Sequence, residues 1–174
     1  MTSRHAQLLI QHIPRLRRYA RALLRDSERA EDLLQETLTR ALGKLGFWHR
    51  GSDMRAWLFS IMHNQYVNDC RRANRRPDSF SLHEDRVQEP SASARAELHV
   101  NLRDIENCLQ RLPEEQRAVL LLVSLEGLSY RQTAKVLDIK TGTVMSRLHR
   151  ARERLREWLS EVPEAPVQSI RSVK

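Results

Sequence analysis

The side chains with the clearest chemical potential form a run of hydroxyl and guanidinium groups in the C-terminal third of the chain. Thr141, Thr143 and Ser146 come first, and Arg147 and Arg150 follow at helical spacing. An arginine can form two parallel hydrogen bonds to guanine, and a hydroxyl can pair with several base edges. The run therefore predicts an element that reads duplex DNA. The alternative interpretation is the solvent-exposed face of an ordinary basic helix.

The residues around this run predict a helix-turn-helix. Ser129 followed by Gln132 is typical of a capping box that begins a first helix. Residues 138–140 interrupt the apolar period, and Thr141 is a suitable N-cap for a second helix. The apolar residues expected to bury one face of that helix recur every three or four positions: Val144, Leu148, Ala151, Leu155 and Leu159. In helix-turn-helix proteins such a second helix enters the major groove.

The composition indicates an all-α protein with an anionic partner. The 174 residues include only five glycines and carry a formal net charge of +8. Leu, Ala, Arg and Glu, which all favour helices, are abundant. A charge excess of this size favours binding to a polyanion, either a nucleic acid or an acidic membrane surface.

No pattern in the sequence indicates catalysis, a metal site or a cofactor. There is no glycine-rich phosphate loop and no nucleophile signature, and the seven histidines lack the spacing of a metal site. Cys70 and Cys108 are isolated, which argues against a disulfide framework or a zinc site. No apolar run approaches the ~20 residues of a membrane span, and no secretory signal is recognisable. We therefore expect a non-enzymatic, cytoplasmic binding protein without a cofactor, a metal, a small-molecule substrate or a membrane-inserted segment.

Two helices are predicted at the N-terminal end. The first covers about residues 3–25, and Pro14 marks either a kink in it or its beginning. Asp26 or Ser27 would cap the second, which ends near Gly43. One side of the second helix carries polar residues suited either to solvent or to a protein partner: Gln35, Glu36, Thr39 and Arg40.

A loop and a third helix follow. Trp48 lies beside Phe47 in the loop, where a large aromatic ring either anchors the core or stacks on an unpaired base. Ser52 or Asp53 would cap the third helix, predicted over residues 54–73. The end of this helix leads into an arginine cluster suited to grip phosphates: Arg71, Arg72, Arg75 and Arg76.

A change of composition divides the chain. Residues 77–96 are rich in serine and carry both signs of charge, which predicts a flexible linker. Beyond it, the apolar run 118–123 is expected to form the core of a second domain, in a helix that begins at Pro113. We therefore expect a first domain, the linker, a second domain and a flexible tail, at residues 1–76, 77–96, 97–162 and 163–174.

Three motifs, in this order along the chain, resemble those of one known family. The first is RAEDLLQETLTRAL at residues 29–42, and the second is DMRAWLFSIMHNQYVNDCRR at residues 53–72. The third is LPEEQRAVLLLVSLEGLSYRQTAKVLDIKTGTVMSRLHRARERL at residues 112–155. Together they resemble the extracytoplasmic-function (ECF) group of the bacterial sigma-70 family, the RNA polymerase sigma factors. The resemblance covers about residues 6–160.

The resemblance implies two helical domains that bind core RNA polymerase, a sigma domain 2 followed by a sigma domain 4. The first motif is similar to the helix that docks on the polymerase β′ clamp coiled coil, and domain 4 would hold the β flap. The polymerase-contacting residues implied by this match are Asp32, Leu33, Gln35, Glu36, Thr39 and Arg40.

The resemblance also implies how promoter DNA is read. Domain 4 would read the −35 element as duplex DNA, through Lys140, Thr141, Thr143, Ser146, Arg147, His149, Arg150 and Arg154. Domain 2 would capture the −10 element as a single strand, through Trp48, Arg50, Asn64, Arg71, Arg72, Arg75 and Arg76. A stacking role for Trp48 is thereby favoured over a core role.

The sequence shows no sensor domain, so we expect external regulation by an anti-sigma factor, in response to stress or another signal. Leu42 stands where the family often has an aromatic residue, and Asn68 where it often has an aspartate. The main alternative is a stand-alone helix-turn-helix regulator that binds operators without polymerase. An RNA-binding or antitermination factor and an enzyme acting on DNA are further alternatives.

Overall fold

The structure is a computed structural model that describes residues 2–49, 52–74 and 95–160, with only the backbone described for residues 2–6, 74 and 95–102. These residues form helices and turns and no strand, so the predicted all-α class is confirmed. The elements are α1 (Thr2–Leu23), α2 (Ser27–Lys44), the 3₁₀ turn η1 (Leu45–Phe47), α3 (Met54–Asn74), α4 (Arg95–Arg111), α5 (Glu114–Leu120), the π-helical turn η3 (Leu121–Leu125), α6 (Tyr130–Leu137) and α7 (Thr141–Ser160). The predicted linker and tail lie largely outside the described residues.

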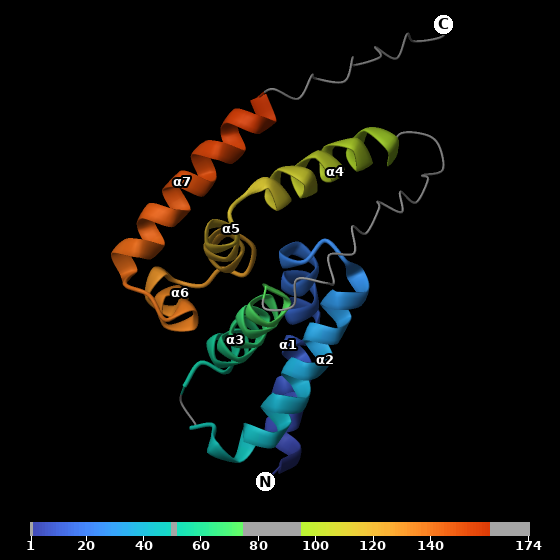
Figure 1. Cartoon of the computed structure of the whole chain (residues 1–174). Coiled ribbons are helices and arrows are strands. Elements are labelled where there is room, and N and C mark those ends of the chain that lie inside the picture. The colour runs from blue at the N-terminus through green and yellow to red at the C-terminus, as the bar shows by residue number, and fades with distance from the viewer. Residues whose placement is uncertain (1, 50–51, 75–94, 161–174) are drawn as a thin grey trace, which may run out of the picture.

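Helices α1, α2 and α3 pack side by side as the N-terminal half (Figure 1). Their shared core includes Leu16, Leu34 and Leu58, each with no exposed side-chain surface. The rings of Tyr19 and Phe59 meet edge to face with centroids 5.2 Å apart. Helix α1 therefore packs against α3 through these two rings, and it also packs against α2.

Aspartates begin two of these helices. The amide groups of Glu28 and Arg29 donate to Oδ1 of Asp26, at 2.8 and 3.1 Å, so Asp26 rather than Ser27 caps α2. In the same way, Asp53 rather than Ser52 caps α3. Each cap satisfies amide groups that have no partner inside the helix.

Helix α1 starts at Thr2 and runs through Pro14, so the helix does not begin at the proline. A proline inside a helix leaves one carbonyl, here that of Ile10, without its usual donor. Pro14 is exposed and Ile10 is 60% exposed, so water can reach this turn. That exposure explains why the helix tolerates the proline.

The apolar run in α5 and η3 is buried on two sides. Val119 and Leu120 pack with Val144 and Leu148 of α7 in a C-terminal core. Leu121 and Leu122 instead belong to the core of the N-terminal half. The prediction that the run is a core segment is confirmed, but it serves two cores. Pro113 is the N-cap of α5 and not its first residue, because Gln116 and Arg117 both donate to its carbonyl.

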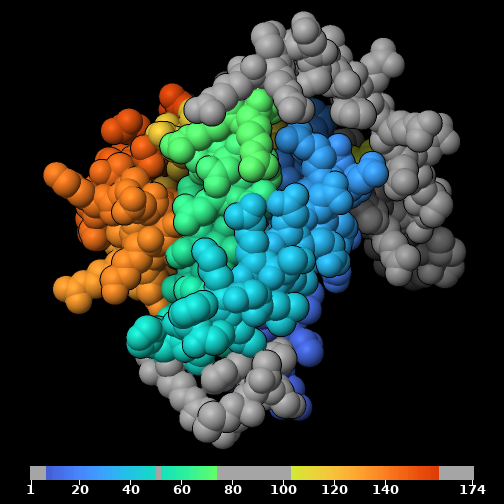
Figure 2. All heavy atoms as spheres, turned by 60° about the horizontal axis from the view of Figure 1, so that its bottom comes forward, coloured from blue at the N-terminus to red at the C-terminus, as the bar shows by residue number. Residues whose placement is uncertain are grey.

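The two halves of the chain dock against each other. Helix α6 lies along α3, and the α5–η3 segment lies between α1 and α7 (Figure 1). In the space-filling view, α6 and α7 in orange abut α3 in green (Figure 2). Over the described ranges, no helix is both long and apolar enough to span a lipid bilayer.

Candidate nucleic-acid and protein interfaces

The helix-turn-helix begins as predicted. The amide of Gln132 donates to Oγ of Ser129 at 3.2 Å, and the amide of Ser129 donates to Oε1 of Gln132 at 2.8 Å, which confirms the capping box. Asp138 ends α6 in the left-handed region, with φ of 52°. The carbonyl of Lys140 accepts from Thr143 and Val144, so Lys140, and not Thr141, occupies the N-cap of α7.

Helix α7 has one buried and one exposed face. Val144, Leu148 and Ala151 are at most 2% exposed, as predicted. Leu155 is partly buried, but Leu159 is 39% exposed, so its predicted place in the core is wrong. The C-terminal core ends at Leu155 and Trp158, and the last turn of α7 extends past it.

Most side chains predicted to read duplex DNA share the outer side of α7. In Figure 1 this helix lies at the margin of the molecule, with α5 and α6 on its inner side. The exposed members of the set are Lys140, His149, Arg150 and Arg154, and the partly exposed members are Thr141, Thr143 and Ser146. Seven of the eight predicted residues are therefore at least partly exposed, although Nη1 of Arg154 donates to Oε1 of Gln116 on α5 at 3.4 Å.

Arg147, the eighth residue, differs from the others. Its side chain is only 22% exposed, and its Nη2 lies 2.5 Å from Oε2 of Glu115 on α5. Burial, and then the positive charge of Arg147, lower the pKa of His63 on α3 to about 4. Arg147 therefore points back toward α5 and α3, which suits a residue that orients α7.

The sequence analysis missed Met145, which is 52% exposed at the start of α7. A methionine in a helix is usually taken for a core residue. Its position directly after buried Val144 places it off the apolar stripe, and this spacing is the signal that could have identified it. An exposed apolar side chain in a recognition helix can contact the methyl group of thymine.

The aromatic loop differs from the sequence interpretation. Phe47 is 81% exposed, whereas Trp48 is partly buried against the core of the N-terminal half. The carbonyl of His49 accepts hydrogen bonds from both the amide and the hydroxyl of Ser52, at 3.1 and 2.8 Å. Phe47 is thus the more accessible stacking surface, and Arg50 lies outside the described residues.

A polar stripe runs along the second half of α3. Asn64, Asn68 and Arg71 are exposed and follow one another at helical spacing, and Arg72 is exposed beside Arg71. Arg72 lies 3.7 Å from Asp69. The predicted Arg75 and Arg76 lie outside the described residues. The described part of the arginine cluster is therefore open to a polyanion.

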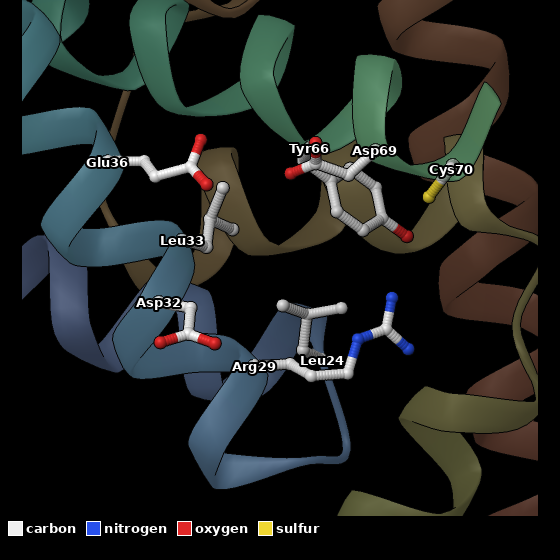
Figure 3. A pocket seen from close by; sticks show the side chains of 8 residues that line it. All are labelled: Leu24, Arg29, Asp32, Leu33, Glu36, Tyr66, Asp69 and Cys70. Atoms are coloured by element: carbon white, nitrogen blue, oxygen red, sulfur yellow. The ribbon is translucent and has the colours of Figure 1, made fainter. Parts of the chain in front are cut away.

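A pocket lies between α2 and α3, and three of the six predicted polymerase-contacting residues line it (Figure 3). Its lining residues are Leu24, Arg29, Asp32, Leu33, Glu36, Tyr66, Asp69 and Cys70. The buried amide of Gln65, which the sequence analysis missed, donates to Glu36 and to Asp69. The carboxylates give this pocket an acidic edge, which suits a basic partner.

The predicted polymerase-contacting residues are exposed with one exception. Asp32, Gln35, Glu36, Thr39 and Arg40 are all exposed on α2. Leu33 is only 4% exposed and belongs to the core of the N-terminal half.

Two titratable groups that line the pocket stay neutral near pH 7. Burial is the largest cause that raises the pKa values of Tyr66 and Cys70.

Two family models match the chain, one in each half. Residues 102–155 match "Sigma-70, region 4", which includes the helix-turn-helix. Residues 9–63 match "Sigma2 domain of PhyR", which includes α2, the aromatic loop and the first half of α3.

Individual proteins are similar over most of the chain. The ECF RNA polymerase sigma factor EcfG of Rhodopseudomonas palustris is 35% identical over 145 residues, which are 82% of this chain and 78% of that protein. The sigma factor RpoE of Bartonella quintana, solved with the anti-sigma factor NepR, is 33% identical with a TM-score of 0.78, over 91% of this chain and 98% of that one. CnrH, solved with the cytosolic domain of CnrY, is 25% identical with a TM-score of 0.67, over 91% and 89% of the two chains.

Proposed function

The chain belongs to the ECF group of RNA polymerase sigma factors, and we propose that it binds core polymerase and directs initiation at promoters with its own −35 and −10 elements. The observation that carries the proposal is the exposed basic side of α7, in the half of the chain that matches sigma region 4. The protein would act by binding, without catalysis and without a cofactor, in the bacterial cytoplasm.

We propose that the −35 element is read as duplex DNA by the outer side of α7. Arg150 and His149 are exposed on this side, with Lys140, Thr141, Thr143, Ser146 and Arg154 near them in the sequence. The two hydrogen bonds of an arginine to guanine give about 1–3 kcal/mol of base discrimination. Arg147 would contribute by holding α7 against Glu115.

We propose that the −10 element is captured as a single strand by the loop and α3. Phe47 offers an open aromatic face, Trp48 supports it from the core, and the polar stripe from Asn64 to Arg71 follows the strand. Arg50, Arg72, Arg75 and Arg76 would add phosphate contacts. Binding the open strand better than the duplex shifts the DNA toward the melted state, so melting needs no hydrolysis.

We propose that the exposed polar side of α2, with the pocket beside it, docks on the β′ clamp coiled coil of polymerase. Asp32 and Glu36 lie at the acidic edge of the pocket, and Gln35, Thr39 and Arg40 extend the same exposed surface. Domain 4 would hold the β flap. The functional domains would span residues 1–76 and 97–162.

We propose that an anti-sigma factor controls the protein, in a stress or other signal response. The similar sigma factor RpoE was solved with the anti-sigma factor NepR, and CnrH with the cytosolic domain of CnrY. An anti-sigma factor of this chain would compete with polymerase for the exposed side of α2.

In vitro transcription with core polymerase and a pool of bacterial promoters tests the proposal. Adding the protein should give promoter-specific transcripts, and Arg150→Ala should lower their yield by about tenfold to a hundredfold. Arg152→Ala is the matched control, because Arg152 is also exposed on α7 but reaches toward Ser124 at 3.4 Å. The absence of transcripts, together with sequence-specific duplex binding by the protein alone, would indicate an operator-binding regulator instead.

A further inference from the structure

An exposed methionine lies among the side chains proposed to read the −35 element. Met145 is the fifth residue of α7, and it is 52% exposed. It belongs to neither of the two apolar cores that the described residues form. Packing within the described part of the chain therefore does not account for an apolar side chain at this position.

Two of the proposed base readers flank Met145 on the same side of the helix. Residues four apart lie one turn from each other in an α-helix, so Thr141 precedes Met145 and His149 follows it on this side. Thr141 is partly exposed, and the side chain of His149 is 72% exposed. Met145 thus lies between two accessible polar residues in the N-terminal half of α7, the part that contacts base edges in helix-turn-helix proteins.

The helix surface beside Met145 carries a glycine. Gly142 lies three residues before Met145 and therefore on the adjoining part of the same side. Beyond its own helix backbone and its two chain neighbours, a Cβ atom added to Gly142 would meet no atom within 4 Å, and Gly142 does not have a positive φ. Glycine also weakens a helix relative to alanine. The lack of a side chain here suits a partner that approaches α7 closely next to Met145.

The major groove offers an apolar side chain one apolar target. Base pairs present hydrogen-bond donors and acceptors there, and thymine adds its C5 methyl group. Methionine has no strong hydrogen-bonding group, so it influences the choice of base through apolar contact. Its unbranched, flexible and polarizable side chain adapts well to such a contact.

We propose that Met145 is a specificity-determining residue of α7, which selects an A·T pair in the −35 element by packing against the methyl group of its thymine. The inference rests on the proposed function, because it requires α7 to lie in the major groove of a −35 element. Burial of one methyl group favours the thymine over a base without that group by about three- to fivefold.

Replacement of thymine by deoxyuridine tests the proposal, because uracil lacks the methyl group and keeps the hydrogen-bonding groups of thymine. Core polymerase with the full-length protein would transcribe a promoter that it recognises, from templates in which each thymine of the −35 element, on either strand, is replaced singly. The polymerase is kept below saturation, so that promoter binding limits the rate. At one thymine at least, the parent protein should lose about three- to fivefold in rate.

The variants assign this loss to Met145. Met145→Ala should lower the rate on the thymine template by the same factor and should be insensitive to deoxyuridine at that position, because both changes remove one contact. Met145→Leu keeps an apolar side chain and should stay sensitive. Leu159→Ala is the matched control, because Leu159 is also an apolar residue of α7, 39% exposed, but lies in its last turn. This variant should behave as the parent does.

A thermal unfolding measurement accompanies the assay. Met145 is exposed, so Met145→Ala should unfold at the parental temperature. If Met145→Ala is destabilised, Met145→Gln takes its place, with the same expected loss of sensitivity to deoxyuridine.

Each outcome decides the inference. A −35 element without an A·T pair, or a parent protein insensitive to every single replacement, would overturn it and leave the proposed function intact. A Met145→Ala variant that keeps the parental sensitivity at every thymine would overturn it as well, and would assign Met145 to a contact other than the methyl group. A parent protein that gives no promoter-specific transcripts would overturn the proposed function together with the inference.

Discussion

The two halves of the molecule build their proposed DNA-binding surfaces in different ways. In the C-terminal half, the residues proposed to contact DNA lie on one helix and its N-cap, and one buried stripe orients them all. In the N-terminal half, a loop supplies the aromatic ring, α3 supplies the polar stripe, and α2 packs beneath them. A surface on one helix can be read from the spacing of residues, whereas a composite surface depends on how three elements pack.

This difference suits the form of DNA that each half is proposed to bind. Duplex DNA offers a regular groove into which a single rigid helix fits. An unpaired strand is flexible and needs stacking and phosphate contacts at several points. The comparison predicts that substitutions on α7 change which promoter is chosen, and that substitutions around the loop change how well any chosen promoter is opened.

The largest effect is expected on α7. Arg150→Ala should lower transcription from a −35-dependent promoter by about tenfold to a hundredfold, because a bidentate pair with a base is lost. Initiation on a template that is already melted at −10 should fall much less. A competition assay with −35 variants would measure the change, and equal losses on all −35 sequences would show that Arg150 contacts only phosphates.

The next largest effect concerns the pH dependence of stability and arises from His63, on α3. Burial lowers the pKa of His63 to about 4, so the protonated form is disfavoured in the folded protein. The histidine should therefore add stability above pH 6.5, and this stability should be lost as the pH falls below 6.5. Between pH 7.5 and pH 5 we expect a loss of about 2 kcal/mol.

His12 should act in the same direction, because burial, and then Arg15, lower its pKa. Denaturant unfolding of the parent and of His63→Gln at both pH values measures the contribution of His63. If His63→Gln loses as much stability between pH 7.5 and pH 5 as the parent does, a residue other than His63 causes that loss.

A smaller effect should separate the two aromatic residues of the loop. Phe47→Ala should reduce open-complex formation by about tenfold, because base stacking on the ring is lost, and should leave thermal stability unchanged. Trp48→Ala should lower the stability as well, since Trp48 packs against the core. Permanganate footprinting of unpaired thymines and thermal unfolding measure the two quantities. Equal losses of stability in both variants would show that Phe47 and Trp48 do not differ in their contribution to the core.

The smallest effect is expected for Glu115→Ala. Glu115 is exposed on α5, and its carboxylate pairs with Arg147. If Arg147 orients α7, losing this pair should lower −35 discrimination by a few fold, and Arg147→Ala in the same background should add little. If Arg147 reads a base directly, the second substitution should instead add a further tenfold loss. A double-mutant cycle on the −35 competition assay gives the answer.

The sequence predicted the elements whose signals are local. The capping box of Ser129 with Gln132 lies within four residues, so the pattern alone placed the start of α6. At the start of α2 the pattern left two neighbouring candidates, Asp26 and Ser27, and the hydrogen bonds to Asp26 decide between them. The apolar stripe of α7 was likewise predictable as far as Leu155. Leu159 continues the same spacing, but it is 39% exposed and lies beyond the described C-terminal core, and spacing alone does not show where a core ends.

The features that the sequence did not predict depend on distant parts of the chain. Phe47 and Trp48 are adjacent large aromatics, and only the packing of the N-terminal core decides which ring faces out. Leu33 shares a helix face with polar neighbours but is drawn into the core. Arg18 and Glu126 are 108 residues apart, so no local pattern pairs them.

The segment of α5 and η3 that is buried in both cores limits how freely the halves can be exchanged between relatives. A hybrid protein that receives residues 95–160 from another sigma factor would bring a foreign η3 to α1 and α3. Its promoter preference would follow the new α7, but its compactness would depend on whether the incoming segment offers a carboxylate to Arg18 and a carbonyl to Arg55, as Glu126 does here. In such a hybrid, promoter preference and compactness would be set by different residues of the same half.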